Sequence, residues 1–304
     1  MTCEVTIGTF NILDPVFAER HKQPQGLNSQ GRSNWDSRGP RLITCIKNSN
    51  LDVICLQEVS EVSKKYFEKF TQDTYVILWS KHQSRHDGVA ILYKKDKVKH
   101  IAFKKFPSEG LCASYVDLQE KASKSVIRVA SCHLLGGPAK GPVHSGKIQV
   151  DKYVSEVEKQ ESSQSYTLEA KIFAGDFNEA NLQSEKFQAL KGYYATDGSS
   201  MITEPDKNRK IDWIWVNSRG FLNQLKVVQE DNLSDHRLLA TKLTLPIQNS
   251  DVPPNQSQPT DGSKIKRHPS SKTIKPLQSS VWQRFKAFFL NIFKAIADLF
   301  NRKR

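Results

Sequence analysis

The chain has 304 residues, enough for one large domain with a sizeable core or for two small domains. Its apolar and charged fractions, 38% and 25%, exclude a wholly disordered chain, and no apolar run approaches the ~18 residues of a membrane-spanning helix. The formal net charge of +13 favours an anionic partner, such as nucleic acid, a phosphorylated substrate or an acidic membrane. From Ile247 onward there are eleven Lys and Arg against three Asp and Glu, so most of this excess lies in the tail.

The first half of the chain alternates short apolar runs with polar segments, which predicts strands separated by loops and a few helices. Helices are predicted at Arg38–Asn48 and Ser63–Phe70, where apolar residues recur at helical spacing. The predicted strands are, in chain order, Val5–Ile12, Leu51–Leu56, Tyr75–Trp79, Val89–Tyr93, Val98–Phe103, Ala113–Leu118 and Val126–Cys132.

The second half begins with a predicted helix, Gln149–Gln160, and adds a short one at Ser184–Leu190. Its predicted strands are Ala170–Ala174, Ile211–Val216, Leu225–Gln229 and Leu238–Leu245. Many strands follow one another without a helix between them. This favours an α/β domain at 1–245 in which two mixed or antiparallel sheets pack face to face with helices outside.

The C-terminal region has a different composition. Residues 246–278 are dense in Pro, Ser, Gln, Asn and Lys and nearly free of large apolar residues, which predicts a disordered linker. In 279–304 the aromatic and aliphatic residues fall three or four apart and basic residues lie mainly opposite, as in a basic amphipathic helix. Such a helix could bind an anionic membrane surface or dock on protein.

The five cysteines form no CxxC pair, and two of them lie within apolar runs, so free buried thiols are expected rather than disulfides or a zinc site. No Sec-type signal is visible at the N-terminus. We therefore expect a cytoplasmic protein, peripherally membrane-bound if the tail helix is an anchor. Secretion as an effector by another route would leave no mark that we can read. The sequence leaves the oligomeric state open.

Polar residues gather at the ends of the predicted strands. Each one alone has a structural explanation: Gly175-Asp176-Phe177-Asn178 is typical of a turn, and Ser234-Asp235-His236 of a helix cap. Strand ends of a sandwich converge on one rim, however, so these residues could meet. Carboxylate and amide oxygens suit Mg²⁺, Mn²⁺ or Ca²⁺, and His and Asn can donate to phosphate oxygens. The set is Asn11, Glu58, His133, Asp176, Asn178, Asp212, Asp235 and His236.

Seven segments occur in the order and with the approximate spacing of a known family. They are Thr9–Leu13, Asp52–Val59, Asp87–Tyr93, Cys132–Leu134, Gly175–Asn178, Ile211–Ile214 and Leu233–His236. From Val5 to Leu245 the chain thus resembles the endonuclease/exonuclease/phosphatase superfamily. The resemblance implies a four-layer α/β/β/α sandwich with the site at one rim. It also implies a metal-dependent hydrolase that cleaves phosphate esters by direct in-line attack of water.

The resemblance also implies a role for each site residue. Glu58 would be the main ligand of Mg²⁺, or of Mn²⁺ in its place, with Asn11 nearby. Asp176 would orient or deprotonate the attacking water, and Asn178 would hold the scissile phosphate. His236 would stabilise the transition state, with Asp235 orienting it. His133 would contact the phosphate or assist the leaving group, and Asp212 would support the site from outside.

The N-terminal part looks most like the deadenylase and nocturnin branch of this superfamily. A polar insertion follows Asn11-Ile12-Leu13, and Trp35-Asp36-Ser37-Arg38 precedes the first long helix. The branch suggests Arg38, Tyr93 and Lys147 as substrate-binding residues. These enzymes often carry an Arg three residues before a Gln in the helix after the His-Leu segment. Here Gln149 is present, but that earlier position is Gly146, which puts poly(A) or nucleotide recognition in doubt.

Three functions therefore remain open. The first is a nuclease or nucleotide phosphodiesterase acting on RNA or a nucleotide. The second is a membrane-associated phosphodiesterase or phosphatase acting on sphingomyelin or a phosphoinositide, which the basic tail favours more than the core does. The third is an inactive protein that binds a membrane or a partner. All the expected active-site residues are present, which favours an enzyme.

Overall fold

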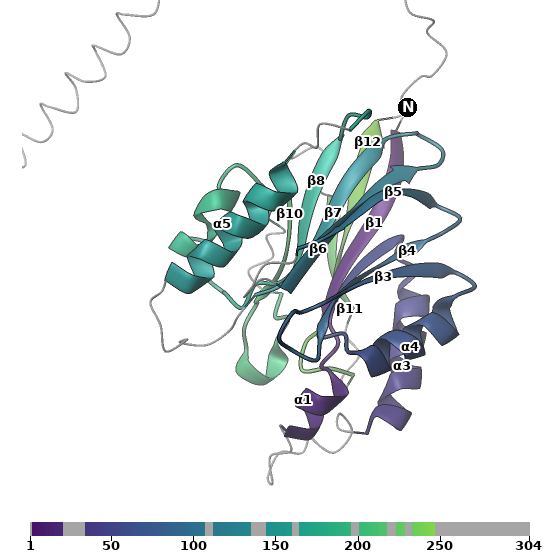
Figure 1. Cartoon of the computed structure of the whole chain (residues 1–304), viewed down its shortest axis with the longest axis vertical. Coiled ribbons are helices and arrows are strands. Elements are labelled where there is room, and N and C mark those ends of the chain that lie inside the picture. The colour runs from purple at the N-terminus through teal and green to yellow at the C-terminus, as the bar shows by residue number, and fades with distance from the viewer. Residues whose placement is uncertain are drawn as a thin grey trace, which may run out of the picture. The chain divides into compact units, whose positions relative to one another are not determined.

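Two six-stranded sheets stack face to face, and helices cover their outer surfaces (Figure 1). The structure is a computed structural model that describes residues 2–20, 34–106, 112–134, 144–159, 164–195, 201–217, 223–228 and 233–246. The predicted helix at 279–304 and all of the predicted linker except Pro246 lie outside these residues. The four-layer α/β/β/α sandwich expected from the sequence is confirmed.

The first sheet has the strand order β11-β12-β1-β2-β4-β3. Its strands are β1 (Thr2–Asn11), β2 (Val53–Gln57), β3 (Tyr75–Lys81), β4 (Gly88–Lys94), β11 (Asn223–Val228) and β12 (Leu238–Pro246). The central pair, β1 and β2, is parallel, with Asn11 opposite Gln57. The other neighbours are antiparallel.

The second sheet repeats this plan with the order β5-β6-β7-β8-β10-β9. Its strands are β5 (Val98–Lys105), β6 (Cys112–Glu120), β7 (Val126–His133), β8 (Ala170–Asp176), β9 (Tyr194–Ala195) and β10 (Asp212–Val216). Here β7 and β8 form the parallel pair, which places His133 opposite Asp176. Because β10 runs antiparallel to β8, its first residue, Asp212, also pairs with Asp176.

Two helices cover the first sheet, and their ends follow from local sequence. Helix α3 (Trp35–Ser49) begins after Asn34, whose side chain accepts a hydrogen bond from the Ser37 amide, and it ends at Asn50 in a left-handed conformation. Helix α4 (Glu61–Thr71) begins with a capping box between Ser60 and Ser63. The short helix α1 (Pro15–Arg20) follows β1 and was not predicted from the sequence.

The second sheet is covered by helix α5 (His144–Glu158) and the 3-10 helix η1 (Glu185–Leu190). A second 3-10 turn, η2 (Pro205–Lys207), lies in a small hairpin that precedes β10. None of the helices in the described part of the chain combines the length and the hydropathy needed to cross a bilayer. The cysteines are free thiols, as expected, and all except Cys3 are buried.

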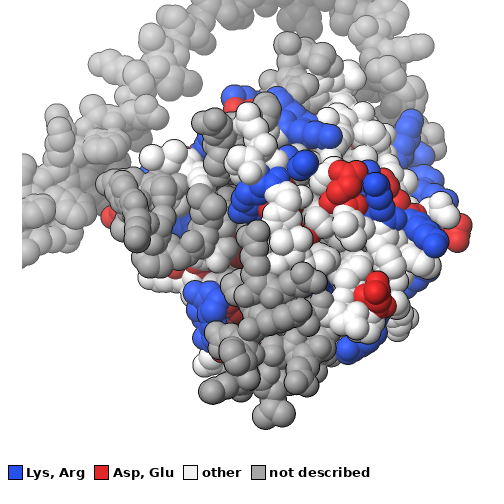
Figure 2. All heavy atoms as spheres, turned by 60° about the horizontal axis from the view of Figure 1, so that its bottom comes forward, with Lys and Arg blue, Asp and Glu red and all other residues white. Residues whose placement is uncertain are grey.

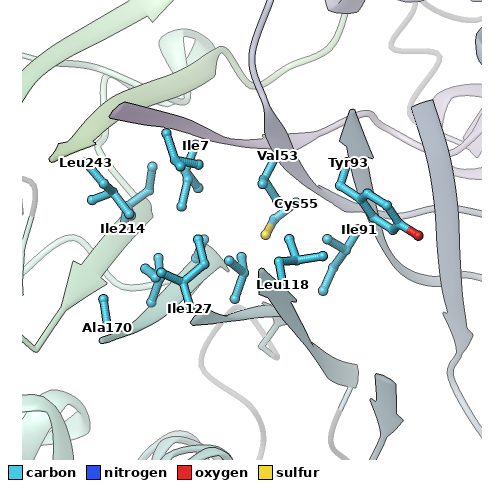
Figure 3. Packing of buried hydrophobic residues seen from close by; sticks show 14 of the residues in the cluster. Ile7, Val53, Cys55, Ile91, Tyr93, Leu118, Ile127, Ala170, Ile214 and Leu243 are labelled. Atoms are coloured by element: carbon cyan, nitrogen blue, oxygen red, sulfur yellow. The ribbon is translucent and has the colours of Figure 1, made fainter. Parts of the chain in front are cut away.

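Apolar side chains fill three layers. The central layer lies between the sheets and includes Ile7, Cys55, Leu118 and Ile214 (Figure 3). An outer layer packs helices α3 and α4 on the first sheet, and another packs α5 and η1 on the second. Each fully buried aliphatic side chain contributes roughly 1.5–3 kcal/mol, so these layers fix the sheets against each other.

Gly175 shows how tightly the second sheet is built next to the polar rim. Its φ is +154°, and a β-carbon at this position would lie 2.1 Å from the carbonyl oxygen of Cys132. Only glycine can therefore bring β8 this close to β7. The next residue is Asp176, so this close approach sets where its carboxylate emerges.

Candidate active site

The topology brings the polar strand ends of both sheets to one rim. The carboxyl ends of the parallel pairs β1–β2 and β7–β8 carry Asn11, Glu58, His133 and Asp176. Strands β10 and β12 run the opposite way, so the residues that precede or begin them, His236 among them, reach the same edge. Strand direction therefore brings these residues from both sheets to one rim.

Asn11 connects the two sheets. Its Nδ2 donates to Glu58 Oε1 and to Asp176 Oδ2, each at 3.1 Å, while its Oδ1 accepts from the Leu13 amide at 3.1 Å. Asn11 is 1% exposed, so these bonds are shielded from water. With this orientation its nitrogen, not its oxygen, faces the carboxylates. A half-turn of the amide would be needed for Asn11 to act as the metal ligand that we expected.

Three residues at this rim adopt left-handed backbone conformations without being glycine: Leu13, Glu58 and Asn178 have φ values of +53°, +57° and +50°. Such conformations cost of order 1 kcal/mol each and persist where surrounding bonds hold them. Glu58 Oε2 accepts from the Asp14 amide at 3.1 Å, and Asp176 Oδ1 accepts from the Asn178 amide at 2.8 Å. The carboxylates themselves therefore help to hold the strained turns.

Glu58 is the carboxylate most suited to a hard divalent cation. Its side chain is 14% exposed, and Asp176 lies just across Asn11. Burial raises the pKa of Glu58, and the negative charge of Asp235 adds to the rise, whereas His133 and the Asn11 amide oppose it. A cation at Glu58 would offset both unfavourable effects. The carboxylates of Glu58 and Asp176 are hard oxygen donors of the kind that Mg²⁺ or Mn²⁺ prefers.

Two other groups of potential ligands lie close together among the described residues: Asp176 with Asp212 and His236, and Glu204 with Asp235 and His236. In each, strong hydrogen bonds already engage the atoms. The Nδ1 of His236 bonds Asp212, and the oxygens of Glu204 accept from Lys207 and Arg209. The hydrogen bonds to Glu58 come from uncharged amides, Asn11 Nδ2 and the Asp14 N–H, so Glu58 is the better candidate for a cation ligand.

His236 and Asp212 form a buried pair. The Nδ1 of His236 is 2.8 Å from Asp212 Oδ2, and its Nε2 is 3.7 Å from Asp176 Oδ2. Burial alone would lower the pKa of His236, but Asp212 outweighs it, with further help from Asp176 and Asp235, and the pKa is well above its usual value. The ring can therefore stay protonated at neutral pH and donate to a phosphate oxygen.

The partner of His236 differs from the sequence expectation. We expected Asp235 to orient the ring and Asp212 to act from farther away, but Asp212 makes the bond to Nδ1. Asp235 Oδ1 instead accepts from the hydroxyl of Ser234 at 3.2 Å. Adjacent residues project differently from the backbone, whereas Asp212 reaches the ring from the neighbouring sheet. Sequence adjacency was therefore the wrong guide here.

Asn178 lies at the rim with its amide group already engaged. Its Nδ2 donates to the Leu134 carbonyl at 2.9 Å, which ties the turn after β8 to the end of β7. The side chain is half-buried, next to Asp176. This places Asn178 where the sequence led us to expect it, and its contact with phosphate stays a prediction.

His133 contacts Arg85, an arginine that the sequence analysis did not single out. Arg85 Nη2 lies 3.1 Å from His133 Nδ1, and Asp87 binds the Arg85 guanidinium at 2.8 and 2.5 Å. Burial opposes protonation of His133, but Asp87 Oδ2, 3.8 Å from Nδ1, together with Asp176 and Glu58, outweighs it and raises the pKa of the ring. In the neutral ring Nδ1 would accept from Arg85, so Nε2 carries a proton in either charge state. This nitrogen is 3.7 Å from Asp176 Oδ2 and 3.9 Å from Glu58 Oε1. Arg85 lies in an irregular loop just before Asp87-Gly88, where only the adjacent motif could have pointed to it.

The three expected substrate-binding residues lie elsewhere. Arg38 is fully buried, and its guanidinium donates to the carbonyls of Ile12, Leu13 and Leu233 at 2.5–2.8 Å, so it braces the rim from behind. Tyr93 lies in the apolar core (Figure 3) and pairs with Val53, at the end of β4 away from the site. Lys147 bonds Asp151 on α5 at 2.5 Å. The structure does not bring these three side chains together with Asp176.

Comparison with known proteins agrees with this geometry. Residues 9–236 match the family model described as "Endonuclease/Exonuclease/phosphatase family". The chain belongs to this family. Members hydrolyse phosphate ester bonds, so the polar rim is the place where such chemistry is expected.

Among curated proteins, an uncharacterised calcium-binding protein of Arabidopsis thaliana is 28% identical over 106 residues. That stretch covers 33% of this chain and only 22% of the plant protein. It therefore supports a local likeness and carries no conclusion about the activity of the whole chain.

Several solved structures share the fold. ANGEL2, described as a 2′,3′-cyclic phosphatase, has a TM-score of 0.64 at 17% identity, covering 80% of this chain and 96% of that one. The human Nocturnin catalytic domain has a TM-score of 0.60 at 17% identity, covering 79% and 92%. A humanised D. rerio TDP2 scores 0.56 at 15% identity, covering 79% and 98%. At these low sequence identities the likeness establishes the fold of the sandwich alone.

Proposed function

We propose that this chain is a divalent-metal-dependent phosphodiester hydrolase that acts on RNA or a nucleotide. The observation that carries the proposal is the placement of Asp176. Its Oδ2 lies 3.1 Å from Asn11 Nδ2 and 3.7 Å from the Nε2 atoms of both His133 and His236. One carboxylate is thus surrounded by groups that can donate to a phosphate, with Glu58 beside it.

Each residue of the site has a separate role in the proposed reaction. Asp176 accepts a proton from water as the water oxygen attacks phosphorus, and the bond from phosphorus to the leaving oxygen breaks on the opposite side. The protonated ring of His236 and the Nε2–H of His133 donate to phosphate oxygens as their negative charge grows. Asn178 holds the phosphate. Attack is direct, with no covalent bond between enzyme and substrate.

The proposed metal position is at Glu58, with Asn11 and Asp176 next to it. When bound there, Mg²⁺ or Mn²⁺ would supply positive charge to a phosphate oxygen and help to lower the pKa of a nearby water. Arg85 and Asp87 keep His133 oriented beside this position.

The charge of the domain is compatible with a polyanionic substrate. Figure 2 brings the lower end of the domain in Figure 1 forward, and Lys and Arg side chains lie at several places on this face among fewer acidic ones. Arg209 and Lys207 lie on the hairpin that contains Glu204, a neighbour of His236. Both cations pair with Glu204, however, so they hold the hairpin rather than offer unpaired charge to a substrate.

A substrate panel tests the proposal. The full chain with Mg²⁺ or Mn²⁺ would be incubated with poly(A), mixed RNA, a 2′,3′-cyclic nucleotide, abasic DNA, a tyrosyl phosphodiester, sphingomyelin and phosphoinositides. We expect release of nucleotides from at least one RNA or nucleotide substrate. The variants Glu58→Gln and His236→Ala serve as matched negative controls, because contaminating enzymes would remain active in both preparations.

Two results would contradict the proposal. Release of phosphocholine or phosphate from lipids alone would favour the membrane-associated phosphodiesterase that the basic tail suggests. No turnover of any substrate by a folded, metal-loaded chain would favour an inactive binding protein.

A further inference from the structure

Lys186 is a buried lysine beside the site for which the reaction described above has no role. It lies in η1, is 8% exposed, and its Nζ donates to the Phe177 carbonyl at 2.5 Å. Phe177 is the residue between Asp176 and Asn178. The lysine therefore bonds the middle of the turn that carries the proposed base and the proposed phosphate-binding amide.

The turn is bonded at each of its peptide groups. The Phe177 amide donates to the Ile211 carbonyl at 3.0 Å, and the Asn178 amide donates to Asp176 Oδ1 at 2.8 Å. Lys186 supplies the donor for the carbonyl of Phe177. Because Asn178 has a φ of +50°, the turn needs such bonds to stay in its left-handed conformation.

Gly146 in helix α5 makes room for this lysine. A β-carbon at position 146 would lie 3.0 Å from Lys186 Cε, 3.2 Å from Cδ and 3.5 Å from Nζ. A side chain there would press on the lysine stem, and the ammonium group would have to shift. The glycine that departs from the pattern expected for this helix is thus matched by a cation that enters the same space from η1.

An uncharged side chain could fill this space at a lower desolvation cost. Burial lowers the pKa of Lys186, while Glu179 and Asp176 oppose the fall, so the charge is kept against a desolvation cost. Replacing a buried charge by an apolar group of similar volume is often neutral or stabilising. A buried charge next to a catalytic carboxylate therefore suggests a functional reason.

We propose that Lys186 is a positioning residue for phosphodiester hydrolysis, which holds the Asp176–Asn178 turn through the Phe177 carbonyl and depends on the absence of a side chain at Gly146. The proposal rests on the proposed function of the same site. Lys186 acts through its neighbours and does not touch the reacting atoms.

The first test is Lys186→Met in the full chain, because methionine keeps the unbranched stem and removes the ammonium group. We expect kcat to fall about tenfold, the loss typical of one bond from a charged donor, with KM changed less than twofold. The melting temperature should fall by a few degrees at most, because one carbonyl loses its donor while the desolvation cost of a buried charge is removed. Lys191→Met, at the exposed C-terminal end of η1, is the matched control and should keep wild-type kinetics.

The second test uses Gly146→Ala. Alone, it should lower kcat because the added methyl group displaces the lysine stem. Combined with Lys186→Met it should cause little further loss, since the ammonium group is already gone. Losses that multiply in the double variant would show that the two positions act independently and would overturn the proposal, as would a Lys186→Met enzyme with wild-type kcat.

Amide hydrogen exchange provides a readout that does not need turnover. Lys186→Met should speed exchange at the Asn178 amide, while Lys191→Met should not. Wild-type protein that turns over no substrate would refute the proposed function. Unchanged exchange at Asn178 would refute the role of Lys186, whether or not the enzyme is active.

Discussion

At the scale of single residues, the site depends on polar groups that face one another from different sheets. Asn11 donates from the first sheet to Asp176 of the second, and Asp212 of the second sheet bonds His236 before β12. Because these groups are buried, each bond is worth more than it would be in water, and each unpaired group would cost more. This is why the charge state of His236 can be predicted from its neighbours.

Asp212→Asn tests that charge state. The Asp212 carboxylate raises the pKa of His236, so the imidazolium persists to higher pH than an ordinary histidine would allow. Without that charge, burial lowers the pKa and the ring loses its proton at a lower pH. We expect the alkaline limb of the kcat–pH profile to move toward lower pH, with at least a tenfold loss of kcat near neutrality. An unmoved alkaline limb would mean that His236 is not the group that must stay protonated.

At the scale of elements, the sequence predicted best what lies at the ends of apolar strands. The strands before Glu58, Asp176 and His133 are short, apolar and easily bounded, so their polar ends could be located. Strand direction then brings the residues together. The short helix α1, the two-residue strand β9 and the turn η2 carry too few residues for a periodic pattern, and they were not predicted.

Side-chain direction is what the sequence could not supply. Tyr93 closes a predicted strand, as do several site residues, but at the other end of the sheet. Nothing in the sequence distinguishes the role of Arg38 from that of Arg85. In the structure, the Arg38 guanidinium donates to buried backbone carbonyls, whereas the Arg85 guanidinium lies beside His133. Deciding between these outcomes requires knowing which strands pair and in which direction.

The variant Arg38→Met distinguishes a structural role of Arg38 from a role in substrate binding. The guanidinium satisfies carbonyls of Ile12, Leu13 and Leu233, and its loss would leave buried acceptors without a donor. We expect the free energy of unfolding in urea to fall by about 3 kcal/mol. The exposed Arg41 on the same helix is the matched control, and Arg41→Met should change stability by less than about 0.5 kcal/mol. A raised KM with unchanged stability would instead favour the phosphate-contacting role expected from the sequence.

At the scale of the whole molecule, the two sheets are built alike. Each has a central parallel pair of strands, and the carboxyl ends of both pairs lie at the same rim. The apolar layers between and outside the sheets hold these pairs in place. The predicted linker and tail helix follow this sandwich in the sequence and, Pro246 apart, lie outside the described residues. Their role therefore stays a prediction from composition and periodicity.

Liposome sedimentation tests the tail. The intact chain and a chain lacking 279–304 would be mixed with vesicles that contain phosphatidylserine. An aromatic, basic amphipathic helix should sediment the intact chain and not the shortened one, and the binding should weaken in high salt. Equal sedimentation of both forms would reject a membrane anchor and favour docking on protein.

The central claim is that a divalent cation at Glu58 and the groups around Asp176 hydrolyse a phosphodiester. The most direct measurement is the initial rate of phosphodiester cleavage as a function of Mg²⁺, for the wild-type chain and for Glu58→Gln, with EDTA as the zero point. We predict a saturable rise with Mg²⁺ in the wild type, no activity in EDTA, and at least a hundredfold lower rate in the variant at any Mg²⁺. Full activity in EDTA, or equal rates for the two proteins, would contradict this account.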